Sequence, residues 1–382
     1  MHVTRLDLRQ LRRFDDVSLA PAPGLNLITG DNGAGKTSVL EALHLMAYGR
    51  SFRGRVRDGL IRSGASALEV FVEWQEPGSP TRPRVLPVVA DTAAPYLRTR
   101  KAGLRHSGQD WSGRLDGAPV GHLGELCAAL AVVTFEPGSH ALVSGGAETR
   151  RRYLDWGLFH VEPDFMAPWR RYARALKQRN ALLKGRARDG QLDAWDIELV
   201  EAGEPLTRHR QCYLESLQPY FTALIADLAP QLGAGNLAYL PGWRRDELSL
   251  ADALLLARER DLASGHTSVG PHRADWRFDF GNVPGRDALS RGQAKLTALA
   301  VLLAQAEHYA GACGDFPVVA LDDLASELDR GHQRRVLERL VATGAQVFIT
   351  GTEAPTALAG LGTEVVQFHV EHGVVHPQPA RA

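Results

Sequence analysis

Residues 25–37 read Leu-Asn-Leu-Ile-Thr-Gly-Asp-Asn-Gly-Ala-Gly-Lys-Thr, and this stretch decides the fold class. The apolar run 25–29 has the length and composition of a buried strand, and 38–46 has helical spacing without a breaker. Between them, 30–37 fits G-x-x-x-x-G-K-[ST], a phosphate-binding loop, in the strand–loop–helix setting that this motif requires. The stretch therefore predicts an α/β domain that binds a nucleotide.

The loop carries the groups that a polyphosphate needs. Backbone N–H groups of the glycine-rich loop and of the helix start surround phosphates well. Lys36 is one of only five lysines among 44 basic residues, and a compact ammonium suits this site. We expect Lys36 to contact the β- and γ-phosphates and Thr37 to ligate Mg²⁺. The residues expected to bind the nucleotide in this loop are Gly30, Asp31, Asn32, Gly33, Ala34, Gly35, Lys36 and Thr37.

Two further apolar runs, 317–321 and 346–350, have strand length, and an Ala/Leu-rich helix is expected over 294–310. Three apolar strands separated by helices indicate a parallel sheet that helices cover on both faces. Asp322 and Asp323 directly follow the run 317–321. Asp322 is therefore expected to hold Mg²⁺, and Asp323 to act as a general base or to position the attacking water.

A third motif, Leu-Ser-Arg-Gly-Gln at 289–293, directly precedes that helix. The first N–H groups of a helix have no partner within the helix, so this position suits an anion. Ser290 and Gln293 would add side-chain contacts. The pentapeptide is weak evidence alone, but it lies shortly before the strand that carries Asp322 and so supports the nucleotide site.

The middle of the chain has a different character. Segment 150–218 is rich in Leu, Ala and Arg and shows almost no strand signal, so it predicts several helices. Proline and glycine predict breaks near Pro163 and Pro168, over 185–190 and at 203–205.

The simplest organisation is an α/β domain that a mainly helical domain interrupts. We expect the α/β domain over 1–128 and 262–382 and the helical domain over 129–261. Residues 67–74 alternate and predict a half-buried strand, whereas 76–118 is expected to form loops and small strands.

The composition excludes several classes of protein. Hydrophobic residues make up 44% and charged residues 23%, which excludes wholesale disorder. The 44 Lys+Arg balance 44 Asp+Glu, which argues against binding a polyanion by bulk charge but allows a local basic patch. Cys127, Cys212, Cys313 and His272 lack companions at metal-ligand spacing, so we expect free thiols and no metal at His272. Without a signal-like or membrane-spanning run, a cytoplasmic location is expected.

One region is locally basic in this neutral chain. Residues 150–188 hold three acids and eleven bases, the bases being Arg150, Arg151, Arg152, Arg170, Arg171, Arg174, Lys177, Arg179, Lys184, Arg186 and Arg188. One interpretation is contact with DNA phosphates, helped by the interleaved Trp169 and Tyr172. The other is a solvated helix face in an arginine-rich protein, with Arg150 to Arg152 in structural ion pairs near Asp155. The sequence leaves both interpretations open.

The order of the motifs resembles the ABC ATPase superfamily. Segment 30–37 is similar to its Walker A motif, 289–293 to its signature and 318–329 to its Walker B and D-loop. Finer features resemble the RecF family within it, from about residue 3 to 370. They are the opening 8–19, Gly-Arg-Ser-Phe-Arg-Gly at 49–54, Arg-Arg-Arg-Tyr-Leu-Asp-Trp-Gly at 150–157, Gly-Pro-His-Arg-Ala-Asp at 270–275, and the paired aspartates 322–323 followed by Ser-Glu-Leu-Asp.

The resemblance implies an ABC-type P-loop ATPase head with an inserted mainly helical domain, and ATP and Mg²⁺ as cofactors. Two such heads sandwich two nucleotides, with Ser290, Gly292 and Gln293 facing the partner's γ-phosphate, so ATP joins a homodimer and hydrolysis releases it. The resemblance also implies binding to single-stranded or gapped DNA and cooperation with the RecO and RecR proteins. It further implies roles in recombinase loading and SOS induction. The location it implies is cytoplasmic and nucleoid-associated, without a membrane partner.

Two departures from the superfamily pattern favour slow hydrolysis. Members often carry a switch histidine after the strand corresponding to 346–350, where this chain has Gly351 and Thr352. Asp323 is one methylene shorter than the usual glutamate at the base position. The glutamine of the Q-loop has no counterpart in 131–138 either.

Other functions stay open as alternatives. An ABC ATPase of another kind, such as a transporter or nuclease-associated subunit, shares the three motifs but not the arginine-rich segment. A GTPase or small-molecule kinase would leave 289–293 without a role, and the chain has no Asn-Lys-x-Asp motif. A scaffold that binds nucleotide without hydrolysing it is a further alternative, against which Lys36, Thr37, Asp322 and Asp323 argue together.

Overall fold

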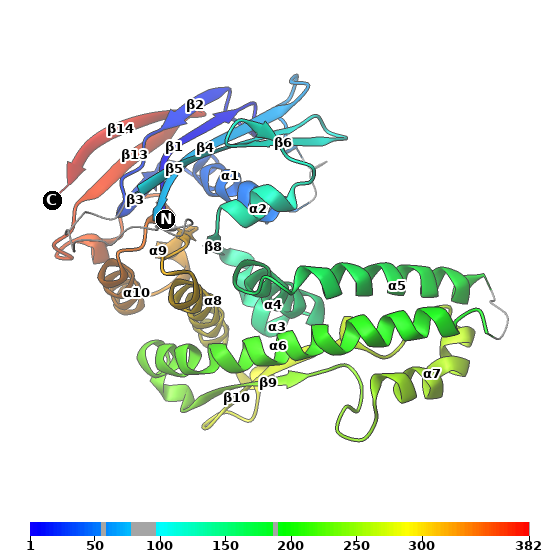
Figure 1. The fold of residues 1–382 in the computed structure, drawn as a ribbon. Helices are drawn as coiled ribbons and strands as arrows, with labels where there is room; N and C mark the ends of the chain where they lie inside the picture. Colours follow the sequence, from blue (N-terminus) through cyan, green and yellow to red (C-terminus); the bar gives the residue numbers. More distant parts are fainter. Residues whose placement is uncertain (55–58, 78–96, 186–189, 382) are drawn as a thin grey trace, which may run out of the picture. The chain divides into compact units, whose positions relative to one another are not determined.

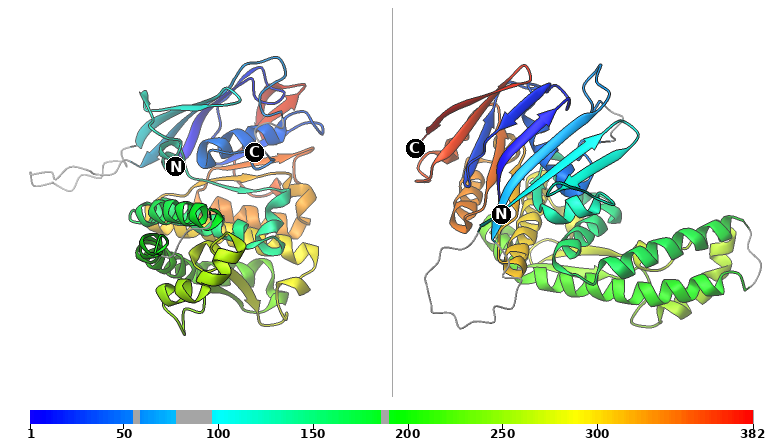
Figure 2. Two further views of the ribbon diagram at one scale, coloured as in Figure 1. Left: turned by 90° about the vertical axis from the view of Figure 1, so that its right-hand side faces the viewer. Right: turned by 45° about the horizontal axis from the view of Figure 1, so that its top comes forward.

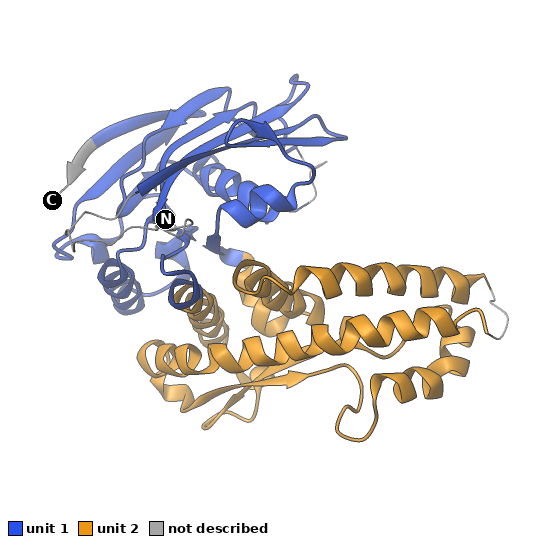
Figure 3. Ribbon diagram, in the orientation of Figure 1, with its two compact units in different colours: residues 1–137, 309–382 blue, residues 138–308 orange. Residues whose placement is uncertain are grey.

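The computed structural model describes residues 1–54, 59–77, 97–185 and 190–381, which form two compact units (Figures 1 and 3). The head unit comprises residues 1–137 and 309–382, and the helical unit comprises residues 138–308. The chain therefore contributes to the head unit twice, on either side of the helical unit.

Two six-stranded sheets form the head unit (Figure 1). The first has the order β14-β13-β3-β12-β11-β8, in which β13 to β8 run parallel and β14 pairs antiparallel with β13. The second is antiparallel, with the order β2-β1-β4-β5-β6-β7. The strands are β1 (His2–Arg9), β2 (Asp16–Leu19), β3 (Leu25–Thr29), β4 (Leu68–Pro77), β5 (Leu97–His106), β6 (Trp111–Leu115), β7 (Ala118–Pro119), β8 (Val132–Phe135), β11 (Val318–Leu321), β12 (Val347–Gly351), β13 (Val365–Glu371) and β14 (Val374–Arg381).

Helix α1 (Lys36–Tyr48) packs against both sheets of the head unit. It contacts β8 and β12 of the parallel sheet and β4 of the antiparallel sheet. Eleven of its 13 residues are buried, as a helix that is apolar nearly all round requires. The phosphate-binding loop therefore leads into the core of the head. The other head helices are α2 (Gly124–Ala129), α9 (Leu324–Glu327) and α10 (Arg330–Thr343).

The apolar runs of the sequence are the central strands β3, β11 and β12, and the alternating run is β4, as predicted. The segment 76–118 is more regular than expected. Strand β5 has ten residues and pairs along its length with β4, because Ala102, Leu104 and His106 alternate onto the buried face. Residues 78–96 of this segment lie outside the described residues.

The helical unit is built around two long helices, α5 (Met166–Lys184) and α6 (Asp193–Leu228), which lie side by side (Figures 1 and 2). Its other elements are α3 (Ala141–Ser144), α4 (Ala147–Val161), α7 (Leu250–Ser264), most of α8 (Arg291–Cys313), and the antiparallel pair β9 (Gly235–Leu240) and β10 (Asp275–Phe280). Among the described helices, none combines the length and the apolar character that crossing a membrane requires.

The break predicted at 203–205 is wrong, because α6 continues through Pro205. Gly203 serves close packing instead: a Cβ there would lie 2.7 Å from Leu250 Cδ2 and 3.1 Å from Tyr172 Cε2. Contacts between helices thus outweigh the local cost of proline. The break expected near Pro163 and Pro168 lies between the end of α4 at Val161 and the start of α5 at Met166. Pro168 itself is in the first turn of α5, where a missing N–H needs no partner.

Both unit boundaries lie later in the chain than the ranges expected from the sequence. Strand β8 pairs with β11, so residues 129–137 belong to the head unit. Residues 262–308 belong to the helical unit, because β10 pairs with β9 and Tyr153 Oη donates a hydrogen bond to the Val301 carbonyl in α8 (2.7 Å).

Candidate functional site

The phosphate-binding loop follows β3 at one end of the parallel sheet. Gly30 has a φ of 145°, and a Cβ on it would lie 2.1 Å from the carbonyl oxygen of Val370 in β13. Only glycine fits this approach. Within the described chain, no side chain caps the start of α1 and its first turn holds no acidic residue. The helix start therefore offers its N–H groups to an anion.

A cavity of about 310 Å³ borders the loop. Its lining residues are Arg12, Arg13, Asn32, Gly33, Gly35, Lys36, Thr37, Ser38, Arg53, Asp323 and Thr350. Four of these side chains are basic and one is acidic, so the cavity attracts an anion of several charges. All of them belong to the head unit.

Lys36 lies at the base of this cavity. Its Nζ donates to the carbonyl oxygens of Gly30 (2.7 Å) and Asp31 (2.9 Å). Burial lowers the pKa of Lys36, while the charges of Asp323, Asp322 and Asp31 oppose that shift. A cation held by neutral carbonyls is ready to exchange them for phosphate oxygens, which bind it more strongly.

Asp322 directly follows β11 and is almost fully buried. Its Oδ1 accepts hydrogen bonds from Thr37 Oγ1 (2.9 Å) and Thr350 Oγ1 (2.7 Å). Burial raises the pKa of Asp322, although these two hydrogen bonds and the charge of Arg53 oppose the shift. A nearby cation would stabilise the carboxylate. Thr37 lines the cavity, and its hydroxyl bonds Asp322. Hydroxyl and carboxylate oxygens are the ligands that Mg²⁺ prefers, so this pair fits a magnesium ion.

Asp323 follows in the left-handed region, with φ 55° and ψ 39°. Its N–H donates to Thr350 Oγ1 (2.8 Å), and its side chain lines the cavity. A non-glycine residue in this conformation is strained and needs support from its surroundings. The hydroxyl of Thr350 supplies that support and at the same time bonds Asp322.

Sequence reasoning missed Thr350 and three arginines of the cavity. Arg12 forms two hydrogen bonds to the fully buried Glu41, from Nε to Oε2 (3.0 Å) and from Nη2 to Oε1 (2.8 Å), and Ser51 also donates to Glu41. Arg13 and Arg53 complete the set. Segments 8–19 and 49–54 entered the sequence analysis only as points of resemblance, because no spacing rule connects them to the loop.

The signature residues lie at the exposed start of α8, in the helical unit. Gln293 Oε1 accepts the N–H of Ser290 (2.9 Å), and Ser290 Oγ accepts the N–H of Gln293 (3.3 Å). This reciprocal pair is a capping box. Gly292 is exposed between them, and a Cβ on it would meet nothing within 4 Å.

Most described bases of segment 150–188 have structural partners. Arg150 is buried and donates to both carboxylate oxygens of Asp275 (2.6 and 2.9 Å). Arg151 donates to the Ala274 carbonyl (2.7 Å). Arg152 pairs with Glu148, Arg171 with Glu198 and Glu201, and Arg179 with Asp196 and Asp261. Arg186 and Arg188 lie outside the described residues.

Four bases lie on an exposed face of α5, here called the basic face: Arg170, Arg174, Lys177 and Lys184. Their spacing places them along one side of the helix. Contact with DNA stays a prediction for this exposed face.

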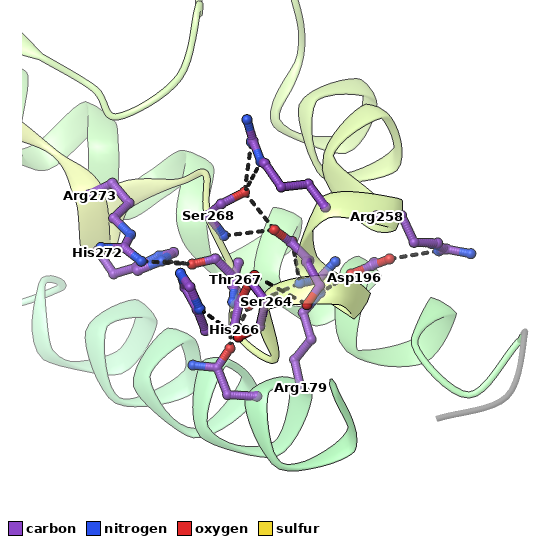
Figure 4. A network of polar contacts seen from close by, with 12 residues as sticks. Arg179, Asp196, Arg258, Ser264, His266, Thr267, Ser268, His272 and Arg273 are labelled. Carbon is purple, nitrogen blue, oxygen red and sulfur yellow. Dashed lines mark hydrogen bonds and ion pairs between the residues drawn. The ribbon is translucent and has the colours of Figure 1, made fainter. Parts of the chain in front are cut away.

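His272 is fully engaged within the helical unit. Its Nδ1 accepts from Tyr172 Oη (2.8 Å) and its Nε2 donates to the Thr267 carbonyl (2.9 Å). Figure 4 shows this histidine beside the buried network around Arg179, Asp196 and Thr267. Burial lowers its pKa to about 4. Among the described residues, no three His, Cys, Asp or Glu side chains are grouped to hold a metal.

Comparison with known proteins gives the family. Residues 2–374 match the RecF/RecN/SMC N terminal domain family. A DNA replication and repair protein RecF from Stenotrophomonas maltophilia is 68% identical over 379 residues, covering 99% of this chain and 100% of that protein. This chain belongs to the RecF family. A RecF family protein from Shewanella oneidensis is 36% identical over 378 residues, covering 98% of this chain and 99% of that protein.

Solved structures agree with the RecF fold. The recombination mediator protein RecF with ATP in the RecFOR pathway has a TM-score of 0.83 at 24% identity, covering 99% of this chain and 98% of that chain. An Smc head domain from Pyrococcus furiosus, with an extended coiled coil, has a TM-score of 0.58 at 16% identity, covering 100% and 96%. The predicted fold class and the predicted RecF family are therefore confirmed.

Proposed function

We propose that this RecF family chain is an ATP-dependent DNA-binding protein of recombinational repair and replication. The observation that carries the proposal is that Lys36, Thr37 and Asp323 line the same cavity. The hydroxyl of Thr37 also donates a hydrogen bond to Asp322. Relatives named DNA replication and repair protein RecF match the chain over nearly its whole length, which supports the DNA-directed role over that of a transporter subunit.

Nucleotide binding rests on the loop and the arginines around it. Lys36 would release the carbonyls of Gly30 and Asp31 and bind the β- and γ-phosphate oxygens. The N–H groups at the start of α1 would add hydrogen bonds to the same phosphates. Arg12, held by Glu41, stands at the cavity edge as a further cation of fixed position.

Hydrolysis rests on the two aspartates. Thr37 and Asp322 would hold Mg²⁺, which when bound neutralises charge that develops on the phosphates. Asp323 would accept a hydrogen bond from the attacking water and orient it. The shorter side chain of Asp323, and Gly351-Thr352 at the position where a switch histidine is usual, favour a slow reaction. The molecule would then act as a switch with a long ATP-bound state.

The proposed dimer and its partners rest on what is expected of the RecF family. ATP would join two copies through Ser290, Gly292 and Gln293 of one copy and the nucleotide of the other. The homodimer would bind single-stranded or gapped DNA and work with RecO and RecR in recombinase loading and SOS induction. Support comes from the exposed positions of Ser290 and Gly292 and from a similar RecF structure described in the RecFOR pathway.

One experiment tests the proposal: ATP hydrolysis by the full chain, measured with and without gapped DNA. We expect slow turnover that DNA accelerates, and none in Lys36→Ala, because the phosphates lose their buried cation. Asp322→Asn should retain most nucleotide affinity but lose Mg²⁺-dependent turnover. ATP binding without any turnover in the wild type would favour the scaffold. Unchanged ATP affinity in Lys36→Ala would remove the loop from the site.

A further inference from the structure

Glu41 is a carboxylate inside the buried helix α1, and its side chain has no exposed surface. A buried carboxylate is unfavourable unless it is paired and hydrogen-bonded. Glu41 accepts two bonds from the Arg12 guanidinium, at 3.0 and 2.8 Å, and one from the Ser51 hydroxyl. Well-packed apolar residues would often stabilise a core at least as well as such an ion pair. The pair therefore suggests a role beyond packing.

The first segment that Glu41 holds is the turn between β1 and β2. Gln10 and Arg12 in this turn have φ values of 52° and 55°, a conformation that is uncommon for residues other than glycine. Such a backbone persists where its surroundings fix it, and it is typical of ligand sites. The Arg12 N–H donates to the Leu60 carbonyl (2.8 Å), and the two bonds to Glu41 fix the guanidinium. The backbone and the side chain of Arg12 are thus both held at the cavity.

The second segment that Glu41 holds is 49–54. Ser51 is buried, and its Oγ donates to Glu41 while it accepts the backbone N–H of Arg53 (3.0 Å). Arg53 lines the same cavity as Arg12. One carboxylate on α1 therefore connects two separate segments of the chain that each place an arginine at the cavity.

We propose that Glu41 is a positioning residue of the nucleotide site. It holds the guanidinium of Arg12 directly and the backbone of Arg53 through Ser51, so that both arginines meet the triphosphate already in place. Glu41 itself is not among the residues that line the cavity, so it acts through the arginines. Cations fixed before binding lose less conformational freedom when the ligand arrives, which raises affinity. The inference rests on the proposed ATP binding.

Steady-state ATP hydrolysis by the full chain tests this role with Glu41→Gln. The amide has nearly the same shape as the carboxylate, but it has a single acceptor oxygen and no charge, so it cannot hold both Arg12 donors. We expect KM to rise about tenfold and kcat to stay within about twofold, because Asp322 and Asp323 are untouched. KM equals the dissociation constant when the chemical step is slow. Calorimetric titration with ATP measures the same affinity without turnover.

A role of Glu41 in folding alone predicts a different result. The melting temperature without nucleotide would then fall, while the ATP affinity of the folded protein stayed at the wild-type value, and that outcome overturns the proposal. The matched control is Asp15→Asn. Asp15 is 69% exposed and bonds Gln10 and Arg62 on the same turn, but it does not line the cavity. This variant should keep the wild-type KM.

A second substitution tests whether Glu41 acts through Arg12. Arg12→Lys keeps the positive charge but cannot form the two-bond fork. In this background, Glu41→Gln should raise KM less than threefold, because the geometry that Glu41 enforces is already lost. An equal rise in both backgrounds means that the two residues act independently, which overturns the proposal.

Lys36→Ala separates this inference from the proposed function. If the wild type binds ATP, Lys36→Ala does not, and Glu41→Gln binds with wild-type affinity, only the role of Glu41 is wrong. A wild type that does not bind ATP overturns both.

Discussion

Thr350 forms hydrogen bonds to both aspartates of the candidate site. Its hydroxyl donates to Asp322 Oδ1 and accepts the N–H of Asp323, at 2.7 and 2.8 Å. Both bonds fix where a carboxylate points, so Thr350 is a positioning residue rather than a catalytic one. Groups that orient a metal ligand typically cost 10- to 100-fold in metal affinity when removed.

We therefore expect Thr350→Val to raise the Mg²⁺ concentration for half-maximal ATP hydrolysis about tenfold. Affinity for ATP without metal should change little, because Lys36 and the loop are intact. Thr350→Ser, which keeps the hydroxyl, should restore the metal dependence. Titration with Mn²⁺, followed by electron paramagnetic resonance, measures the same affinity without turnover. A valine variant with wild-type Mn²⁺ affinity would contradict this role.

His272 makes the stability of the helical unit depend on pH. Its folded pKa is about 4, whereas an unfolded histidine has a pKa near 6.5. Between these values the unfolded chain binds more protons, so stability falls as the pH drops from about 6.5 towards 4. Protonation would also break the bond that Nδ1 accepts from Tyr172.

We expect this histidine to cost about 2 kcal/mol of stability between pH 7.5 and pH 5. The loss of melting temperature over that range should be smaller in His272→Asn, which does not titrate, although the variant is less stable at pH 7.5. His372→Asn is the control, because His372 is 91% exposed. Equal pH dependence of His272→Asn and the wild type would show that this ring does not govern acid sensitivity.

Packing between α4, α6 and α8 explains the last residue of the 150–157 motif. A Cβ on Gly157 would lie 1.9 Å from Tyr213 Oη and 2.7 Å from Gln305 Nε2. These two groups also lie at hydrogen-bond distance from each other, at 3.1 Å. Glycine is therefore required by contact between helices, not by backbone conformation.

We expect Gly157→Ala to destabilise the helical unit by about 1–3 kcal/mol, since an added methyl group overpacks the contact. The midpoint of urea unfolding measures this loss. Gly146→Ala is the matched control, because a Cβ at Gly146 meets nothing within 4 Å. Gly146 is the N-cap of α4, where glycine is preferred to alanine, so its effect should stay within about 1 kcal/mol. If both variants unfold at the same urea concentration, the close contact of Gly157 with Tyr213 and Gln305 does not limit the stability of the helical unit.

If the helical unit binds DNA, we expect the basic face of α5 to make the phosphate contacts. Arg171 is excluded from it because Glu198 and Glu201 hold its guanidinium. We expect Arg174→Glu with Lys177→Glu to weaken binding to gapped DNA and to flatten the plot of log affinity against log salt. Each lost phosphate contact lowers the slope by about 0.9 on duplex and about 0.7 on single strands.

The control for this prediction is Arg244→Glu, at a 79% exposed arginine outside α5. It changes the net charge without touching the basic face, so its salt slope should equal that of the wild type. If both variants have the wild-type affinity and salt slope, the basic face of α5 is only a solvated surface. DNA contacts then have to be sought on the head unit.

At the scale of the whole molecule, ATP is expected to join two copies. Ser290→Arg places bulk and charge where the partner's γ-phosphate is expected, so this variant should bind ATP and stay monomeric in sedimentation. Ser290 also caps α8 through Gln293. Ser290→Ala loses this cap, which costs about 1 kcal/mol, and the hydroxyl contact, but it adds no bulk or charge, so it should dimerise less than the wild type and more than Ser290→Arg. A dimer that forms equally without ATP would contradict the clamp.

The sequence by itself determined which residues form the core of the candidate nucleotide site. Strand 25–29, the loop 30–37 and the aspartates after 318–321 are contiguous patterns, and strand ends in a parallel sheet meet at one edge. Lys36, Thr37, Asp322 and Asp323 could therefore be assigned before any coordinates. The family could be named for the same reason, because its motifs are short and linear.

Only the tertiary structure decided the rest, because it depends on residues far apart in the chain. Thr350 on β12 forms a hydrogen bond to Asp322, which follows the neighbouring strand β11. Arg12 pairs with Glu41 of the buried helix α1. The sequence left Arg150 open between phosphate contact and a structural ion pair, and its partner in the structure is Asp275, 125 residues away. Local sequence records charge and periodicity, whereas a buried ion pair or a glycine contact exists only where distant segments pack together.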